Sequence, residues 1–165
     1  MSYELSIEKL SEKEIEIFTT IKATAYADDR LKIEFDDIEK PSWFDGEWYV
    51  GLGILNIEET KRLMKEFSCY LIYRMEEAIG GFWVHVEEED SLTLEDFCIL
   101  PQHQGKGYGT KSLQLIENYF GYNKRWLLTT PYFCKRNCHL YEKNGYKKTG
   151  YVSNNTVVVY EKYLQ

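Results

Sequence analysis

Apolar and polar residues alternate along YELSIEKL, residues 3–10, with the two-residue period of a half-buried β-strand. Ser11 and Glu14 then have the spacing of a capping box, in which each side chain binds the backbone of the other at a helix N-terminus. Apolar residues recur at helical spacing over residues 17–25. The chain is therefore predicted to start with a strand and to continue into a helix that extends to Asp28–Asp29.

The pattern changes twice in the middle of the chain. Residues 56–67, NIEETKRLMKEF, have helical spacing and begin with Asn56 as a candidate N-cap. Apolar and β-branched runs that are separated by charged turns then predict an antiparallel meander. Its three strands are CYLIYRM at 69–75, AIGGFWVHV at 78–86 and LTLEDFCIL at 92–100.

The last third of the chain alternates helices with strands. A glycine-containing segment leads into a helix over residues 112–120, and a second, shorter helix covers residues 136–144. Strands are predicted at residues 125–133 and, as the final element, at residues 156–164. The complete element order is β-α-α-β-β-β-α-β-α-β-β, which indicates a mixed α/β or α+β layer architecture.

Composition narrows the functional classes. With 44% hydrophobic and 28% charged residues and no linker or repeat, residues 1–165 are predicted to form a single globular domain. The formal net charge of −7 argues against nucleic-acid binding, which needs Lys and Arg to neutralise phosphates, but it suits a cationic small molecule. No apolar run reaches the roughly 20 residues of a membrane span, and the N-terminus does not resemble a signal peptide. We therefore expect a cytoplasmic protein that binds neither nucleic acid nor membrane.

The four cysteines form no paired framework. Cys134 and Cys138, followed by His139, could suggest zinc, but there is no second pair to close a tetrahedral site. Buried or partly buried free thiols are therefore predicted for these two and for Cys69 and Cys98, which is typical of a reducing cytoplasm. No metal ion is expected.

Glycines occupy three alternate positions in QHQGKGYGTK, residues 102–111, directly before a predicted helix. The segment fails both the Walker pattern G-x4-G-K-[ST] and the dinucleotide pattern G-x-G-x-x-G, because Thr110 stands where each requires glycine. Glycine still permits unusual dihedral angles and close approach of a ligand to the backbone. Together with Lys106 and the N–H groups of the first helical turn, the segment is a candidate anion site, and a tightly packed turn is the alternative.

Two motifs at a proper separation carry a resemblance to a known family. Gln104–Gly109 fits the pattern Q/R-x-x-G-x-G/A and directly follows LEDFCILP, and the two together resemble the cofactor motif of the GNAT superfamily of N-acetyltransferases. NCHLYEKNGYKKTGY, residues 137–151, is similar to the second motif of that family, a short helix that carries a tyrosine and ends in Gly-Phe or Gly-Tyr. The resemblance implies the GNAT fold, a mixed central sheet of about seven strands flanked by about four helices. In that fold a splayed strand pair holds the cofactor.

The resemblance also implies how acetyl-CoA, the acyl donor, would bind. It would lie between the strand that holds residues 97–100 and the strand that holds residues 126–130. The backbone of Cys98, Ile99 and Leu100 would bind the pantetheine arm and the thioester. Main-chain amides would hold the pyrophosphate, from Gln104, Gly105, Lys106, Gly107, Tyr108, Gly109 and Thr110.

Two positions depart from the family pattern. Gln104 stands where many relatives carry arginine, so the charge assistance of that side chain is absent. Many relatives also place an asparagine seven residues before the tyrosine, where this chain has Cys134. Asn137, four residues before Tyr141, shares a helical face with it and is predicted to approach the cofactor instead. For Cys134 a packed thiol is favoured over an acyl-cysteine.

Acetyl transfer to an amine requires two proton transfers, because the cationic amine must lose a proton and the departing CoA thiolate must gain one. The family position of the acid matches Tyr141, whose alternative role is to pack in the core. A carboxylate suits the base; Glu95 is the first candidate, Asp96 the second, and a water-mediated path the alternative. Successive strand residues face opposite sides, so only one of the two carboxylates is expected to face the acceptor.

The predicted activity is N-acetyl transfer from acetyl-CoA to a primary amine, directly and in a ternary complex. The acceptors considered are small cationic amines, such as a polyamine or an aminoglycoside, and peptide amines. Residues 31–55 and the loops near Tyr151 are expected to select the acceptor. In residues 31–55 the aromatic and acidic side chains would do so, and the alternative for the aromatic ones is packing over the core; the residues are Asp36, Asp37, Trp43, Phe44, Asp45, Glu47 and Trp48. The alternative is a CoA-binding sensory or interaction module without turnover, and the protein is expected to be a monomer or a homodimer.

Overall fold

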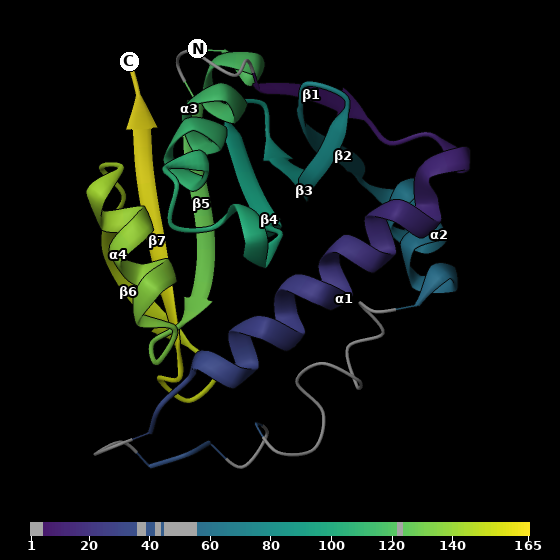
Figure 1. Ribbon diagram of the computed structural model, residues 1–165. Coiled ribbons are helices and arrows are strands. Elements are labelled where there is room, and N and C mark those ends of the chain that lie inside the picture. Colours follow the sequence, from purple (N-terminus) through teal and green to yellow (C-terminus); the bar gives the residue numbers. More distant parts are fainter. Residues whose placement is uncertain (1–4, 36–38, 42–43, 45–55, 122–123) are drawn as a thin grey trace.

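The computed structural model describes residues 5–35, 39–41, 44, 56–121 and 124–165. These residues form one seven-stranded sheet with helices packed on it (Figure 1). The strands are β1 (Leu5–Lys9), β2 (Ser68–Arg74), β3 (Glu77–Glu88), β4 (Ser91–Ile99), β5 (Lys124–Pro131), β6 (Lys147–Val152) and β7 (Val157–Leu164). The helices are α1 (Ile15–Lys32), α2 (Ile57–Glu66), α3 (Tyr108–Phe120) and α4 (Lys135–Lys143), with short 3-10 turns at Glu12–Glu14 and Pro101–His103. The element order is the predicted one.

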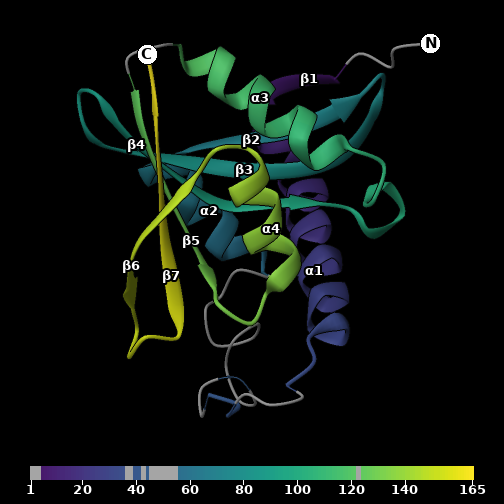
Figure 2. The ribbon, with the colours of Figure 1, turned by 90° about the vertical axis from the view of Figure 1, so that its left-hand side faces the viewer.

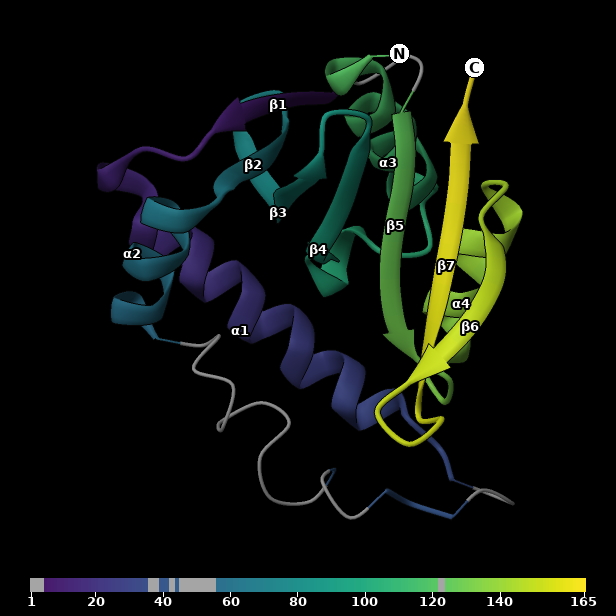
Figure 3. The same cartoon turned by 180° about the vertical axis from the view of Figure 1, so that it is seen from behind.

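The sheet is mixed, with the strand order β1-β2-β3-β4-β5-β7-β6. Every neighbouring pair is antiparallel except β4 and β5, which run parallel. These two strands pair only where Ser91–Thr93 lies against Arg125–Leu127, and beyond that point they diverge (Figure 3). The predicted splayed strand pair is therefore present, and it opens toward the carboxyl ends of β4 and β5.

Two apolar clusters cover the two faces of the sheet. The larger joins α3 and α4 to the sheet around Trp126 and Tyr160, which are completely buried. The other packs α1 and α2 against the opposite face, with Phe18 and Leu71 at its centre. The carboxyl-terminal half of α1 and the start of α4 face each other near the diverging ends of β4 and β5 (Figure 2). Residues from both faces therefore converge at the opening.

Local signals explain where most helices begin. The Asn56 side chain accepts a hydrogen bond from the Glu59 amide at 2.7 Å, as the predicted N-cap of α2. The Ser11 amide donates to the Glu14 carboxylate at 3.0 Å, which forms the predicted capping box ahead of α1.

No helix in the described part of the chain is long and apolar enough to cross a membrane.

Two helix boundaries differ from those that the sequence pattern predicts. α1 continues to Lys32, whose ammonium group pairs with Asp28 one turn earlier and supports the extra turn. α3 begins at Tyr108 rather than at residue 112, because Gly107, in a left-handed conformation, serves as its N-cap. Gly109 and Thr110 therefore belong to the first turn of α3.

Candidate active site

Two different physical reasons explain why QHQGKGYGTK has glycine at three positions. Gly105 and Gly107 have φ angles of +71° and +81°, and a Cβ atom on either would point into open space. Gly109 has an ordinary conformation, but a Cβ there would lie 3.3 Å from the Leu140 side chain on α4. The first two let the backbone turn with its surface free for a ligand, and the third lets α3 and α4 pack closely.

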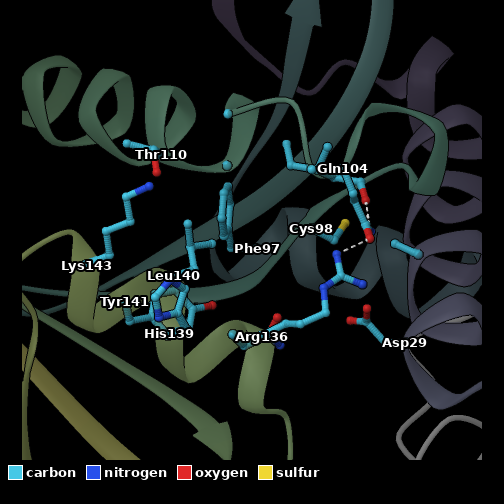
Figure 4. Close-up of a pocket in the computed structure, with 16 residues that line it drawn as sticks. Asp29, Phe97, Cys98, Gln104, Thr110, Arg136, His139, Leu140, Tyr141 and Lys143 are labelled. Carbon is cyan, nitrogen blue, oxygen red and sulfur yellow. Dashed lines mark hydrogen bonds between the residues drawn. The ribbon is translucent and has the colours of Figure 1, made fainter. Parts of the chain in front are cut away.

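A cavity of about 340 Å³ lies along this loop and is called the loop cavity below (Figure 4). The amides of Tyr108, Gly109 and Thr110 open α3 before its first internal hydrogen bond, from Lys111 to Gly107, so they suit an anion. The cavity is lined by Ala25, Asp29, Phe97, Cys98, Ile99, Gln104, Gly105, Gly107, Gly109, Thr110, Arg136, Asn137, His139, Leu140, Tyr141 and Lys143.

Basic side chains of α4 line the loop cavity, and none of them is among the site residues predicted from the sequence. Arg136 donates a hydrogen bond to the Gln104 side chain at 2.6 Å, and Gln104 in turn donates to the Ile99 carbonyl at 2.7 Å. His139 and Lys143 lie on the same side of α4, three and seven residues after Arg136 (Figure 4). Gln104 itself carries no charge, but the guanidinium group of Arg136 lies beside it, in the lining of the same cavity. The helical spacing of these basic residues is the signal that could have revealed them.

Three residues that were predicted to bind the donor do not line this cavity. The Leu100 amide donates a hydrogen bond to the Ile79 carbonyl, and the Leu100 carbonyl accepts one from the His103 amide. The Lys106 ammonium group donates a hydrogen bond to the Gln102 carbonyl at 2.7 Å, which holds the loop in place. The Tyr108 ring is buried in the core on the α3 side, so only its amide faces the start of the helix.

A second cavity, of about 150 Å³, lies between the diverging strands and is called the strand cavity. Its lining comes from four elements, with Tyr26 and Asp29 on α1, Leu94, Glu95, Asp96 and Phe97 on β4, Thr129, Thr130 and Pro131 on β5, and Cys134, Asn137 and Tyr141 at or on α4. Asp29, Phe97, Asn137 and Tyr141 line both cavities. The two cavities therefore meet at the opening between β4 and β5, at Tyr141.

Tyr141 is buried and lines both cavities. Tyr141 is 6% exposed, and none of the described residues forms a hydrogen bond with its hydroxyl. Burial, with the nearby carboxylates of Asp29 and Glu95 adding their charges, raises the pKa of the phenol above its usual range. The hydroxyl therefore stays protonated at neutral pH and is able to donate a proton.

Glu95 is a half-buried carboxylate on the other side of the opening. Burial, followed by the neighbouring charges of Asp96 and Glu87, raises the pKa of Glu95 to about 7. Within the described part of the chain no cation pairs with it. A group with this pKa exchanges a proton readily near neutral pH, which suits a general base.

A bulge in β4 places Glu95 and Asp96 together. Glu95 lies opposite Trp83 and Cys98 opposite Gly81, so two residues of β4 face the single residue Phe82. Asp96 has a φ of +50° at this point. The expectation that the two carboxylates face opposite sides is therefore wrong, because both line the strand cavity.

The Asp96 carboxylate is fully occupied by neighbouring side chains. Lys22 donates to it at 2.6 Å and the Trp83 indole at 2.8 Å, and the Tyr26 hydroxyl donates to its other oxygen at 2.9 Å. Asp96 therefore lines the cavity as half of an ion pair, whereas Glu95 is the carboxylate that remains without a cation.

The remaining predicted residues are at the opening as well. Asn137 lines both cavities and makes a long contact of 3.5 Å to the Thr130 hydroxyl. Burial raises the pKa of the Cys134 thiol far above its usual range, which keeps it a neutral thiol and disfavours an acyl-cysteine. All four cysteines are free, and the described residues hold no cluster of three or more side chains suited to a metal ion.

Most of the segment expected to select the acceptor lies outside the described residues, including Asp36, Asp37, Trp43, Asp45, Glu47 and Trp48. Phe44 is described and is 7% exposed. Its ring packs on Phe35 and Phe133, with centroids 4.8 and 5.6 Å away. For Phe44 the packing interpretation is therefore the one that its surroundings support.

Comparison with known families decides the identity of this fold. Residues 65–148, about half of the chain, match the sequence model of the acetyltransferase (GNAT) domain. The chain belongs to the GNAT acetyltransferase family. The matched segment contains the first sequence motif, the second motif as far as residue 148, the strands that diverge, and Tyr141. A comparison with curated proteins gives no match.

Solved structures share the GNAT fold at low sequence identity. A GNAT family acetyltransferase from Streptococcus agalactiae has a TM-score of 0.74 and 19% identity, over 98% of this chain and 96% of its own. A spermidine N-acetyltransferase from Vibrio cholerae, in complex with CoA and spermine, has a TM-score of 0.62 and 14% identity, over 95% and 92%. The acetyltransferase from Salmonella typhimurium that modifies the N-terminal serine of ribosomal protein L7/L12 has a TM-score of 0.67 and 14% identity, over 99% of this chain and 97% of its own. The predicted GNAT fold is confirmed, and the protein is an acyltransferase of this family.

Proposed function

We propose that this GNAT protein transfers an acetyl group from acetyl-CoA to a primary amine by direct transfer in a ternary complex. The observation that carries the proposal is the meeting of the two cavities at the opening between β4 and β5. A donor in the loop cavity and an acceptor in the strand cavity would come together beside Tyr141. Proximity of this kind removes much of the entropic cost of a bimolecular step.

The residues of the loop cavity fit the donor. CoA carries a diphosphate, and Gly105 and Gly107 leave open space over backbone amides at the start of α3. Arg136 and Lys143 line the same cavity and supply positive charge for phosphate oxygens. The apolar side chains of Phe97 and Ile99 suit the pantetheine arm. When bound, acetyl-CoA supplies an activated acyl group on a thiol leaving group.

Two side chains carry the proton transfers in this proposal. Glu95 takes a proton from the ammonium group of the acceptor, which frees the nitrogen lone pair for attack on the acyl carbon. Tyr141 donates its hydroxyl proton to the departing CoA sulfur. Asp96 is engaged by Lys22, Tyr26 and Trp83, so the base is assigned to Glu95 rather than to Asp96.

The charge of the strand cavity favours a cationic acceptor. Asp29 and Glu95 both line it, and among the described residues no Lys, Arg or His side chain does. We propose a small cationic amine, of the polyamine or aminoglycoside kind, or a basic peptide amine. The spermine in the related Vibrio cholerae structure and the peptide substrate of the Salmonella typhimurium enzyme are consistent with this range.

The function is tested by incubating the protein with acetyl-CoA and separate panels of polyamines, aminoglycosides, amino acids and peptides, while free thiol is followed. Thiol release that depends on one class of amine, with the acetylated amine detected by mass spectrometry, is the expected result. Tight CoA binding with no amine-dependent thiol release would overturn the proposal and leave a CoA-binding module.

Gly107→Ala is expected to weaken CoA binding about tenfold, because an L-residue at φ +81° strains the loop that carries the anion-binding amides. Gly121→Ala is the matched control. Gly121 also has a left-handed φ, of +88°, and open space around it, but it ends α3 away from the cavity. Both variants should lose about 1–2 kcal/mol of stability, whereas only Gly107→Ala should change the Kd for CoA in calorimetry. Equal CoA affinity in the two variants would contradict the assignment of the loop.

Asp29→Asn is expected to raise the KM for a cationic amine about tenfold and to leave kcat within about twofold. Asp29 lines the strand cavity, and burial raises its pKa while Arg136 and Lys32 lower it. Loss of a half-buried charge removes attraction that is common to ground state and transition state. The neighbouring Asp28 lines none of the cavities and pairs with Lys32, so Asp28→Asn is a control with the same change of charge. The prediction fails if both variants change KM equally.

A further inference from the structure

We propose that Lys22 is a positioning residue whose ammonium group clamps Asp96 in the left-handed conformation that forms the β4 bulge and aims Glu95 at the acceptor. The inference rests on the proposed function for its catalytic consequence. Three observations support it: the conformation of Asp96, the burial of Lys22, and the reversal at the bulge of the alternation of β4 side chains between the two faces of the sheet.

The conformation of Asp96 is the first observation. A bulge whose first residue is left-handed usually has glycine at that position, because a Cβ atom makes a positive φ unfavourable. Asp96 nevertheless has a φ of +50°. A residue in such a conformation persists only where its surroundings over-determine it. Hydrogen bonds from Lys22, Tyr26 and Trp83 to the carboxylate supply that constraint.

The burial of Lys22 is the second observation. Its side chain has no solvent exposure, and it lies among core residues of α1 such as Phe18 and Ile21. A charged side chain in such a place needs a partner of opposite charge, and the Asp96 carboxylate lies 2.6 Å away. Tyr26 stands one helical turn after Lys22 and binds the other oxygen of the same carboxylate. One face of α1 therefore holds both carboxylate oxygens.

The third observation is that the alternation of β4 side chains between the two faces of the sheet is reversed after the bulge. Leu92 and Leu94, before the bulge, belong to the core on the α3 side, and so does Ile99, after it. Cys98 belongs to the core on the α1 side. A regular strand would place residues 94 and 98 on one face and residue 99 on the other. The bulge reverses the alternation, which brings Glu95 and Asp96 to one cavity and keeps Phe97 at the boundary of both.

Two double variants separate the clamp from simple packing. Lys22→Met/Asp96→Gly and Lys22→Met/Asp96→Ala both replace the buried ion pair without leaving an unpaired charge. They differ by one methyl group at residue 96, and only the glycine adopts a positive φ without strain. The alanine variant is expected to have a kcat/KM for the amine at least about tenfold lower than that of the glycine variant. Its Kd for CoA is expected to be severalfold higher. Circular dichroism and thermal unfolding report the folded fraction of each.

The pH profile reports the surroundings of Glu95, from which both double variants remove the same charge. Asp96 is one of the charges that raise the pKa of Glu95. Removing it in the glycine variant is therefore expected to shift the acid limb of kcat/KM to lower pH than in the wild-type protein. Single Lys22→Met, which leaves Asp96 buried without its cation, is expected to lose activity more strongly than the glycine double variant.

The outcomes are distinguishable. A glycine variant that folds while the alanine variant does not would support the clamp. Equal kcat/KM and equal CoA Kd in the two double variants would overturn it, as would a single Lys22→Met variant with wild-type kinetics. A glycine variant that binds CoA normally but has lost all turnover would also overturn it, because Asp96 would then act chemically. If the wild-type protein acetylates no amine, the proposed function fails, and the ratio of CoA Kd values still decides the clamp.

Discussion

Tyr141→Phe is expected to lower kcat by about 10²–10⁴-fold and to leave the Kd for CoA within about twofold of the wild-type value. The tyrosine lines both cavities, and the described residues leave its hydroxyl without a hydrogen bond. Its raised pKa keeps the proton on the phenol at neutral pH, so that a proton is available when the CoA thiolate departs beside it. Phenylalanine retains the ring and its packing but supplies no proton.

The measurement compares steady-state kinetics with CoA binding by calorimetry for Tyr141→Phe and a control, Tyr160→Phe. Tyr160 is also completely buried and its hydroxyl donates to Glu142 at 2.8 Å, but it lines neither cavity. The control should lose about 1 kcal/mol of stability with little change in kcat. Loss of CoA affinity in Tyr141→Phe, with a proportional loss of stability, would instead assign this tyrosine to packing.

Glu95→Gln is expected to lower kcat/KM by about 10²–10³-fold above neutral pH and to abolish the acid limb of its pH profile. A base works in its deprotonated form, so wild-type activity should be present above the Glu95 pKa of about 7 and should fall as the pH drops through it. The profile of kcat/KM reports the free enzyme, in which this carboxylate is half-buried beside Asp96 and Glu87. An unchanged acid limb in Glu95→Gln would assign proton removal to water or to another group.

The same substitution should stabilise the protein at high pH. The folded state raises the Glu95 pKa from 4.5 to about 7, so its favourable contribution is fully present below pH 4.5 and is lost as the pH rises through 7. Above that pH the wild-type protein holds a charged carboxylate in a half-buried site, and glutamine relieves it by roughly 3 kcal/mol at most. Thermal unfolding of both proteins at pH 5 and pH 8.5 tests this, and a gain at pH 5 alone would contradict it.

Glu87→Gln offers a milder control for the same pH argument. Glu87 lies on β3, accepts a hydrogen bond from the Thr93 hydroxyl and adds to the rise in the Glu95 pKa. Its removal should move the acid limb of kcat/KM to lower pH with little loss of maximal rate. A large fall in the maximal rate would show that Glu87 has a further role.

Local sequence was sufficient for the order of the elements and for the position of the glycine loop at residues 102–111. Alternation and helical spacing depend on each segment burying one face, so they predicted seven strands and four helices. The glycines at 105 and 107 and the tyrosine at 141 also follow local rules, because a left-handed turn and a helix face are properties of a few consecutive residues.

The residues alone carry the GNAT resemblance, the glycine loop at 102–111 and two candidate proton-transfer groups, Tyr141 and Glu95. What surrounds these two groups depends on the folded chain. Arg136 reaches Gln104 from another helix, and Lys22 reaches Asp96 across 74 positions of the chain. Strand alternation predicts opposite faces for Glu95 and Asp96, and that rule fails at a bulge because a partner from α1 holds one residue left-handed. Periodicity shows which residues of one segment share a face, but it does not show which distant segment that face meets, so only the folded structure reveals these pairings.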